Sequence, residues 1–495
     1  MTHHFEARNY DFTPFPTVKN WIGGQWIEGT GSETYEVMNP RHGQVMATAR
    51  SSTSQDVAAA VEASKVNLKE WQSKPTRERA EVFYNLRNIM HNNLEELTWL
   101  VSHENGKTYA EAKAEVLKGI ECVEFGCSLP NLAAGQQLDV SRGVNCRVVY
   151  ESLGVVAGIT PFNFPMMVPL WMLPQALVGG NAFILKPSEQ VPLSVVRLAE
   201  MLQEAGLPDG IFNFVNGGKE TVEALCDNED IDALAFVGST RVAKLVYGRA
   251  AQTGKRVLCL GGAKNHLIVV PDANVELTAQ NVMASFTGCA GQRCMAASVL
   301  VAVGDIDHII HEICNQASLM KVGEELGAIT NASSVDRITG YINRAEESGS
   351  KILVDGRGKS GGTGGYWVGP TIIDNVSKGA PAACDEIFGP VLSIVRVNTI
   401  DEAIQLENSS PYGNASSIYT TNGEIAQRVM KEVSAGMCGV NIGVPVPREP
   451  FGFGGWNDSK FGHGNITGWD GFRFWTRPRK ITNKWALQKD ATWMS

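Results

Sequence analysis

The sequence predicts a two-part α/β fold, and three observations lead to that prediction. Short, β-rich apolar runs alternate with helical runs up to about residue 260, and a second alternation of the same kind extends to about residue 442. Strands that alternate with helices indicate βαβ units and parallel sheets. The length of 495 residues is enough for roughly two to four domains, each with its own core. We therefore expect a change of domain near residue 260.

The first part is expected to begin with two amphipathic helices, over 53–71 and 76–103, because apolar residues recur there at helical spacing. Apolar and polar residues alternate in 146–151 closely enough to predict a strand. The parallel sheet is then expected to take its strands from 155–159, 182–185, 212–215, 233–237 and 257–260, with helices such as 193–205 and 221–227 between them.

The second part is expected to repeat this pattern. Its strands are predicted at 266–270, 298–303, 391–397 and 438–442, and its helices near 275–287, 335–348, 401–408 and 424–434. The glycine-rich stretch 356–365 is predicted to be an exposed loop.

Charge and composition exclude several classes of partner. The chain has 43 Lys and Arg against 52 Asp and Glu, a net charge of −9, and contains no basic run. Nucleic acids and anionic membranes are therefore not expected partners. The first residues lack the apolar stretch of a secretion signal. The ten cysteines are thus expected to be free thiols in a reducing, cytoplasmic setting.

One uncharged stretch, residues 152–185, is long enough to resemble a membrane span. It contains Pro161, Pro165, Pro169 and Pro174. Such breaks leave backbone polar groups unpaired in lipid unless protein covers them. A buried segment of a folded domain is the favoured interpretation.

The segment GCAGQRCMAAS, residues 288–298, places Cys294 among small residues and directly after Arg293. Small neighbours let a substrate approach, and a nearby cation favours the thiolate. The segment alone fits a small buried apolar cysteine equally well, and Cys289 is just as ambiguous. The spacing of the two cysteines fits neither a zinc site nor a redox C-x-x-C motif, so no metal is expected.

The segment around Cys294 resembles the active-cysteine motif of the aldehyde dehydrogenase superfamily. Five further blocks match in order: PFNFP (161–165), KPSE (186–189), FVGST (236–240), EIFGP (386–390) and PFGFGG (450–455). The similarity runs from about residue 20 to 485. It implies a Rossmann-type NAD-binding domain (1–135 and 152–260), a catalytic domain (261–460) and a small β oligomerisation arm (136–151 and 461–495).

The resemblance also implies roles for single residues. Cys294 would be the nucleophile, and the Asn163 amide with the Cys294 N–H would stabilise the oxyanion. No G-x-G-x-x-G fingerprint is present, so the cofactor site rests on the resemblance. Its residues would be Ser239 at a helix start for the pyrophosphate, Lys186 and Glu189 for the adenosine ribose, Glu386 and Phe388 for the nicotinamide side, and Thr160 and Phe162 beside them. Glu189 would repel a 2′-phosphate, which favours NAD over NADP.

One departure narrows the expected function. Hydrolytic members carry a glutamate general base at the position that Leu260 occupies here, and no carboxylate occurs between Arg256 and Val270. Leucine cannot deprotonate water, so the thioester intermediate needs another acceptor. The block GAKNH (262–266) resembles the CoA-acylating methylmalonate-semialdehyde dehydrogenase branch. That branch implies malonate or methylmalonate semialdehyde as substrate, coenzyme A as co-substrate, and acetyl-CoA or propionyl-CoA as product.

The acidic substrate needs cationic partners, and Arg293 is the expected one because a guanidinium binds a carboxylate bidentately. The branch usually has a second arginine in the helix that follows the ENGK block (104–107), and Lys118 stands at the matching place here. Lys118 fits a solvated helix lysine equally well. A hydrolytic dehydrogenase of another acidic semialdehyde stays open as the alternative. The resemblance also implies a homodimer or homotetramer, with Phe474, Trp475 and Trp485 buried by a neighbouring subunit.

Overall fold

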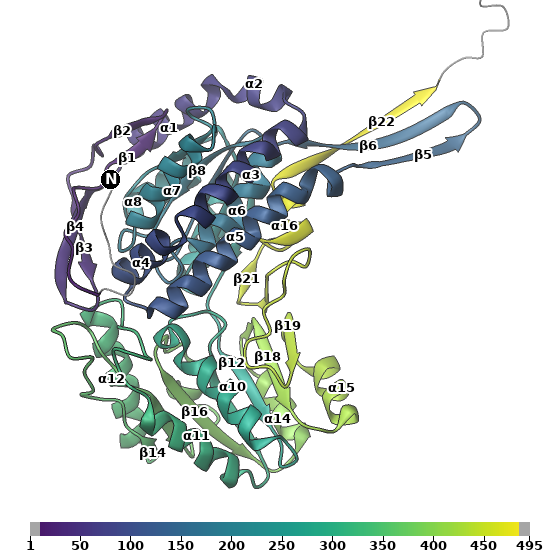
Figure 1. Cartoon of the computed structure of the whole chain (residues 1–495). Coiled ribbons are helices and arrows are strands. Elements are labelled where there is room, and N and C mark those ends of the chain that lie inside the picture. The colour runs from purple at the N-terminus through teal and green to yellow at the C-terminus, as the bar shows by residue number, and fades with distance from the viewer. Residues whose placement is uncertain (1–9, 485–495) are drawn as a thin grey trace, which may run out of the picture.

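Two sheets form the body of the molecule, and a narrow three-stranded arm projects from it (Figure 1). The structure is a computed structural model that describes residues 10–484. Each sheet has its own helices, and buried apolar residues fill the space between sheet and helices. The predicted α/β architecture with mainly parallel sheets is confirmed.

The first sheet has the strand order β2-β1-β9-β8-β7-β10-β11-β21. Strands β7 to β11 pair in parallel, and nearly all their residues are buried, which explains their continuous apolar sequences. The strands are β1 (Asn20–Ile22), β2 (Gln25–Ile27), β7 (Val155–Ile159), β8 (Ala182–Lys186), β9 (Phe212–Phe214), β10 (Ile231–Val237), β11 (Arg256–Leu260) and β21 (Lys460–Phe461).

The helices of this first body include two that the sequence predicted as continuous and the structure divides. The predicted helix over 53–71 breaks at Asn67, and that over 76–103 breaks at Asn93, whose side chain donates to the Ile89 carbonyl. Asparagine competes with helical hydrogen bonding in this way. The helices are α1 (Ser54–Val66), α2 (Leu68–Ser73), α3 (Thr76–Asn92), α4 (Leu94–Asn105), α5 (Tyr109–Leu132), α6 (Met167–Val178), α7 (Leu193–Glu204), α8 (Lys219–Asp227), α9 (Thr240–Gln252) and α16 (Gly468–Phe474).

The second sheet has the order β14-β15-β16-β13-β12-β18-β19. Its strands are β12 (Asn265–Val269), β13 (Ala297–Val303), β14 (Lys351–Val354), β15 (Thr371–Asp374), β16 (Val391–Val397), β18 (Ala415–Tyr419) and β19 (Met437–Val440). Its helices are α10 (Val275–Thr287), α11 (Asp307–Leu319), α12 (Ala332–Glu347), α13 (Pro381–Cys384), α14 (Ile400–Asn408) and α15 (Gly423–Glu432). The sequence did not predict β18, because buried Ser416 and Ser417 interrupt its apolar run.

The arm consists of β5 (Gln136–Ser141), β6 (Val144–Ser152) and β22 (Thr476–Lys484), with β6 in the middle. The sequence predicted that Phe474 and Trp475 would be exposed until a neighbour covered them, and this is wrong. Both are buried in the chain's own first core, where Trp475 meets Phe183 edge to face. Trp485 lies outside the described residues. Helix α16 also packs on α6, so the arm strand begins only at Thr476.

Short elements complete the chain. They are the hairpin β3 (Thr34–Asn39) and β4 (Gln44–Arg50), the pair β17 (Tyr412–Gly413) and β20 (Trp456–Asn457), and the 3-10 turn η1 (Gly288–Gly291). The uncharged stretch 152–185 forms β7, α6 and β8 inside the first body. Across residues 10–484, no helix is both long and apolar enough to cross a membrane.

Candidate active site

A large cavity of about 1320 Å³ lies where the loops of the two sheets meet. Strand β10 lies on the opposite side of β7 from β8, so the strand order reverses between β7 and β10. Ligands of open parallel sheets bind at such switch points, beyond the carboxyl ends of the strands. Four of the loops that line the cavity follow the ends of β7, β8, β10 and β11. The fold therefore places these sequence blocks side by side.

Nine of the eleven residues that the sequence predicted for the site line this cavity. They are Thr160, Phe162, Asn163, Lys186, Glu189, Ser239, Cys294, Glu386 and Phe388. Cys294 and Glu386 come from the second sheet, from the segments that precede β13 and β16. The cavity is thus shared between the two bodies, with the thiol contributed by one and the carboxyl-end loops by the other.

Two asparagine side chains anchor the main chain of the Cys294 loop. The side-chain amides of Asn265 and Asn414 donate to the Cys294 carbonyl at 2.8 and 3.0 Å. Upstream, Cys289 and Ala290 adopt left-handed backbone conformations with φ of 53° and 52°. Such conformations persist only where the surrounding contacts fix them, and they cluster at functional sites.

Asn163 lies against the same loop. Its Nδ2 donates to the carbonyl oxygen of Gln292 at 2.9 Å, and its side chain is buried. The amide is therefore a fixed hydrogen-bond donor, anchored to the main chain two residues before Cys294. Together with a main-chain N–H, such a donor can stabilise negative charge on an oxygen that forms beside the sulfur.

The electrostatics of the site work against a thiolate in this state. Burial raises the pKa of the Cys294 thiol to about 12, and the negative charge of Glu386 contributes, whereas Arg293 opposes the rise. Burial also raises the pKa of Glu386 to about 7, although the Ala263 N–H and the charges of Lys264 and Arg337 counteract it. At neutral pH the thiol is protonated and Glu386 is close to half-ionised.

The other end of the cavity offers groups suited to a dinucleotide. Ser239 is the N-cap of α9 but its side chain makes no capping hydrogen bond, so the first N–H groups of the helix stay available to an anion. Lys186 Nζ and Glu189 Oε2 form an ion pair at 3.1 Å. Burial disfavours the Glu189 carboxylate, but the charge and hydrogen bond of Lys186, together with a main-chain hydrogen bond, outweigh burial and lower the pKa of Glu189. The Glu189 side chain is therefore an anionic acceptor.

The two predicted substrate cations do not line the cavity. The Arg293 guanidinium donates to the carbonyls of Ala284 and Ser285, at the end of α10. Lys118 forms ion pairs with Glu449 at 2.7 Å and with Glu121 at 3.0 Å. Both side chains are cationic, as a partner of a carboxylate must be, but in this structure they bind groups of the protein instead of facing the cavity.

Comparison with known proteins identifies the family. The model of the aldehyde dehydrogenase family matches residues 26–481. The chain belongs to the aldehyde dehydrogenase family. Malonate-semialdehyde dehydrogenase 1 of Geobacillus thermodenitrificans (strain NG80-2) is 45% identical over 482 residues, which cover 96% of this chain and 100% of that protein.

Solved structures agree with this assignment. The methylmalonate-semialdehyde dehydrogenase DddC of Oceanimonas doudoroffii superimposes with a TM-score of 0.94 at 38% identity, covering 96% of this chain and 99% of that one. A Sinorhizobium meliloti 1021 protein solved in complex with NAD gives 0.93 at 38% identity, with coverage of 97% and 100%. The predicted family, the fold class and an oxidoreductase acting on aldehydes are thereby confirmed.

Within this aldehyde dehydrogenase, sequence reasoning missed several residues of the site. Asn414, which holds the Cys294 carbonyl, belongs to none of the matched blocks. Asn265 is part of the GAKNH block, so a signal for it was present, but its role as a loop anchor was not predicted. Phe164, Val168 and Trp171 form an apolar part of the cavity wall. Their proximity to Cys294 depends on how α6 packs.

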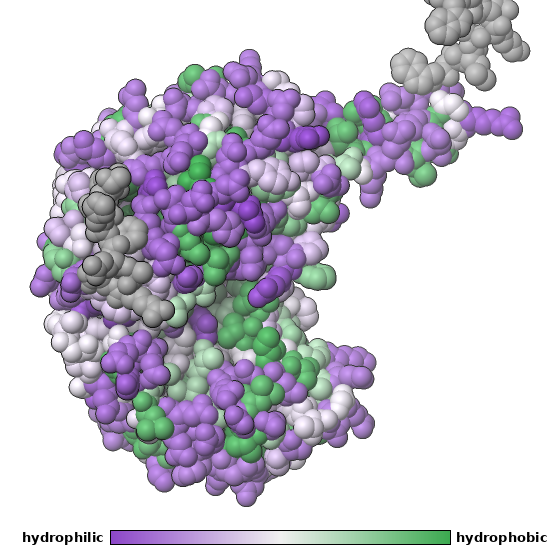
Figure 2. All heavy atoms as spheres, viewed as in Figure 1, coloured by the Kyte–Doolittle hydropathy of each residue, from purple (hydrophilic) through white to green (hydrophobic). Residues whose placement is uncertain are grey.

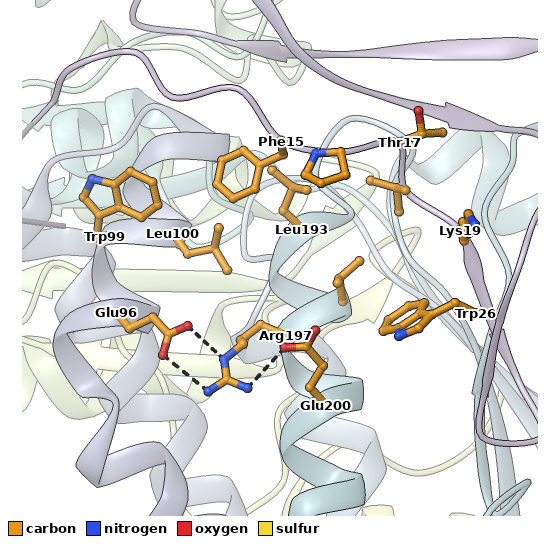
Figure 3. Close-up of a pocket in the computed structure, with 13 residues that line it drawn as sticks. Phe15, Thr17, Lys19, Trp26, Glu96, Trp99, Leu100, Leu193, Arg197 and Glu200 are labelled. Atoms are coloured by element: carbon orange, nitrogen blue, oxygen red, sulfur yellow. Dashed lines mark hydrogen bonds and ion pairs between the residues drawn. The ribbon is translucent and has the colours of Figure 1, made fainter. Parts of the chain in front are cut away.

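A second, smaller cavity of about 260 Å³ shares no lining residue with the first. Figure 3 shows aromatic side chains such as Phe15, Trp26 and Trp99 around it, with Arg197 held between Glu96 and Glu200. None of the residues predicted for catalysis or cofactor binding lines this cavity. The chemistry of the aldehyde dehydrogenase is therefore assigned to the larger one.

Proposed function

We propose that this aldehyde dehydrogenase uses NAD to oxidise malonate or methylmalonate semialdehyde and transfers the acyl group to coenzyme A. The substrate's carboxylate leaves as CO2 or bicarbonate, and the product is acetyl-CoA or propionyl-CoA. The relatives at 45% and 38% identity that carry semialdehyde dehydrogenase names support the substrate class. The observation that supports acyl transfer is the residue at position 260.

Leu260 ends β11 and is buried in the first core. Hydrolytic members of the superfamily use a glutamate there to deprotonate water, and leucine has no such chemistry. Neither β11 nor the start of β12 supplies another carboxylate, since none occurs from Arg256 to Val270. A thioester on Cys294 would therefore survive long enough for a thiol such as that of coenzyme A to attack it.

The residues of the chain have these roles in the proposal. The Cys294 thiol gives its proton to solvent, and its sulfur attacks the aldehyde carbon. The Asn163 amide with the Cys294 N–H stabilises the resulting alkoxide. Loss of hydride then leaves an acyl thioester on Cys294. Loss of the β-carboxylate as CO2 leaves an enolate of the thioester, which takes up a proton from solvent at its α-carbon. The CoA thiol, after giving its proton to solvent, then attacks the thioester carbonyl carbon. The shortened acyl group passes to coenzyme A, and the Cys294 sulfur leaves as the thiolate. NAD, when bound, supplies the acceptor for the hydride.

The cavity fits NAD by its chemistry. The free N–H groups at the start of α9 suit a pyrophosphate, and the Glu189 carboxylate suits ribose hydroxyls and repels a 2′-phosphate. Glu386 and Phe388 would lie on the nicotinamide side, with Thr160 and Phe162 next to them. The rings of Phe162 and Phe388 contact each other edge to face, with 5.8 Å between their centroids.

We propose Arg293 as the partner of the substrate carboxylate. Its positive charge opposes the rise in the pKa of Cys294, which supports a place for Arg293 near the thiol. The carboxylate would replace the α10 carbonyls that the guanidinium now contacts. Lys118 is the weaker of the two candidates, because Glu449 and Glu121 already neutralise it.

The test is the dependence of NADH formation on coenzyme A. With either semialdehyde and NAD, the protein should release one equivalent of NADH per active site in a burst and then stop, and coenzyme A should restore steady turnover. Mass spectrometry should identify acetyl-CoA or propionyl-CoA. Cys294→Ala should abolish both phases. Full turnover to the free diacid without coenzyme A would contradict the proposal.

Hydrolysis is the second candidate, and one observation favours it. Glu386 lines the same cavity, and its negative charge contributes to the raised pKa of Cys294. Its own pKa of about 7 suits a general base. If the protein turns over without coenzyme A, Glu386→Gln should then abolish that turnover. If acyl transfer is correct, the same change leaves the requirement for coenzyme A intact.

We also propose a cytoplasmic homodimer or homotetramer. All ten cysteines are free, as a reducing compartment allows. Exposed apolar side chains occur between β19 and β20, and Figure 2 shows hydrophobic side chains gathered in the hollow beside β19 and β21. The large apolar side chains that are exposed from Val440 to Trp456 are Val440, Ile442, Val446, Phe451 and Trp456. A patch of this kind is typical of a surface that another subunit covers.

A further inference from the structure

A buried ion pair joins Lys107, just before α5, to Glu115 on α5, and the proposed chemistry does not use it. Lys107 Nζ lies 2.5 Å from Glu115 Oε2, and the two side chains are 1% and 0% exposed. Removing two charges from water is costly, so a buried pair is weak evidence for a stabilising role. Its other contacts indicate what it does.

Both partners use their remaining hydrogen-bonding capacity on the loop that carries Asn163. Lys107 Nζ donates to the Asn163 carbonyl at 2.8 Å and lies over the Phe164 ring at 4.2 Å from its centroid. Glu115 Oε1 accepts the N–H groups of Met166 and Met167 at 2.9 and 3.2 Å. The pair thus fixes the main chain of this loop from Asn163 to the start of α6.

A second carboxylate of α5 holds the other half of the site. Glu111 Oε1 accepts the Cys289 N–H at 2.6 Å, where the backbone has its left-handed conformation. The other oxygen of Glu111 accepts from the N–H and the hydroxyl of Thr108 and so caps α5. One turn of helix therefore contacts the Asn163 loop and also the segment leading to Cys294.

We infer that Lys107, together with Glu111 and Glu115, is a positioning residue that sets the distance between the Asn163 amide and the Cys294 loop. The inference rests on the proposed function only in its assignment of Asn163 and Cys294 to the oxyanion site. It does not depend on the substrate or on coenzyme A. Donors act on an oxyanion only within hydrogen-bond distance, so small shifts of the Asn163 main chain reduce the rate steeply.

The decisive variant is Lys107→Met combined with Glu115→Gln. It removes the donor to the Asn163 carbonyl, leaves no unpaired buried charge, and retains an amide oxygen that caps Met166. The control is Lys113→Met, on the same helix as Glu115. It breaks an ion pair with Glu95 at 2.8 Å, whose side chains are 41% and 49% exposed. Exposed pairs of this kind contribute little.

The measurement is the rate of the NADH burst with propanal and NAD in the absence of coenzyme A. The double variant should lose roughly 10- to 100-fold in burst rate, with an unchanged dissociation constant for NAD, and the Lys113→Met control should match the wild type. An unchanged burst rate in the folded double variant would overturn the inference. If the double variant does not fold, Glu111→Ala decides by the same criterion.

A comparison with Asn163→Ala separates positioning from general destabilisation. If Lys107 acts through Asn163, adding the double variant to Asn163→Ala should cause no further loss of burst rate. If the burst rate of the combined variant instead falls by the product of the two separate losses, the double variant acts independently of Asn163, and the inference is overturned. If Asn163→Ala alone keeps the full burst, the assignment of the oxyanion site in the proposed function fails instead.

Discussion

At the scale of single residues, the charge of Glu386 and the reactivity of Cys294 are coupled. Burial and the Glu386 carboxylate raise the pKa of the thiol to about 12, so the resting thiol is protonated at neutral pH. The pKa of Glu386 itself is raised to about 7. The carboxyl group is therefore neutral below pH 7 and repels a thiolate only above it.

Glu386→Gln should consequently lower the pKa of Cys294 and change its reactivity in a pH-dependent manner. Below pH 7, wild type and variant should react alike with iodoacetamide, because Glu386 is protonated in the wild type. Above pH 7 the variant should be alkylated several-fold faster, since a charge interaction of one pKa unit corresponds to about tenfold. The measurement is the alkylation rate of Cys294 against pH, with Cys294→Ala as the background.

Glu189→Gln is the matched control for this experiment. Glu189 lines the same cavity, and its carboxylate is paired with Lys186 at 3.1 Å. Its variant should follow the wild-type profile. Equal or slower alkylation of Glu386→Gln at pH 8 to 9 would show that this carboxylate does not control the thiol.

At the scale of elements, the close packing of α5 on α6 places the Asn163 loop. Glycines of α5 allow this approach: a Cβ at Gly126 would lie 2.6 Å from Pro174 Cβ, and one at Gly119 would lie 2.8 Å from Leu170 Cδ1. Helix α6 follows directly on the PFNFP block, and Glu115 of α5 accepts its first N–H groups. A shift between these helices would therefore move Asn163.

Gly126→Ala should destabilise the fold although alanine is the better helix former. The added methyl group would overlap Pro174, and such overpacking costs about 1–3 kcal/mol. The control is Gly248→Ala in α9, where nothing lies within 4 Å of the new Cβ. That change should stabilise the helix by up to about 1 kcal/mol. Urea unfolding of both variants gives the two free energies, and a stabilised Gly126→Ala would refute the packing argument.

At the scale of the whole molecule, the parallel strands were predictable and much of the rest was not. Strands such as β7 and β8 are buried on both faces, so their sequences are continuous apolar runs. Strand β18 is equally buried but carries Ser416 and Ser417, whose environment only the folded sheet defines. The burial of Trp475 likewise depends on a long-range contact with Phe183.

In the site, too, the features that depend on long-range contacts could not be predicted from the sequence. Residues at the ends of strands could be expected in one cavity from their blocks, because the fold brings the carboxyl ends of parallel strands together. Side-chain direction could not be assigned: Arg293 follows the Cys289 turn and points to α10, and Lys118 pairs with Glu449, far away in sequence. The structure therefore adds what is absent from local sequence, namely the partner of each charge.

The arm has no core of its own. At its base, Tyr150 of β6 packs edge to face on Trp469 and Phe472 of α16. The outer strand β5 is exposed along its whole length, and its Leu138 and Val140 are 67% and 50% exposed in the single chain. A second subunit that covers these side chains would stabilise the arm and remove its exposed apolar surface from water. The double variant Leu138→Glu and Val140→Glu should therefore leave the chain folded but monomeric, because the carboxylates would be desolvated in the interface.

Light scattering coupled to size-exclusion chromatography measures the mass, and a thermal melt at the same concentration reports folding. The matched control is Val66→Glu with Leu319→Glu, two positions on the body that are 76% and 79% exposed, and it should keep the wild-type mass. Since an exposed position tolerates glutamate in a monomer, a reduced mass with an intact fold locates the interface on the arm. An unchanged mass in the arm variant would instead require that the subunits meet elsewhere, for example at the apolar hollow beside β19.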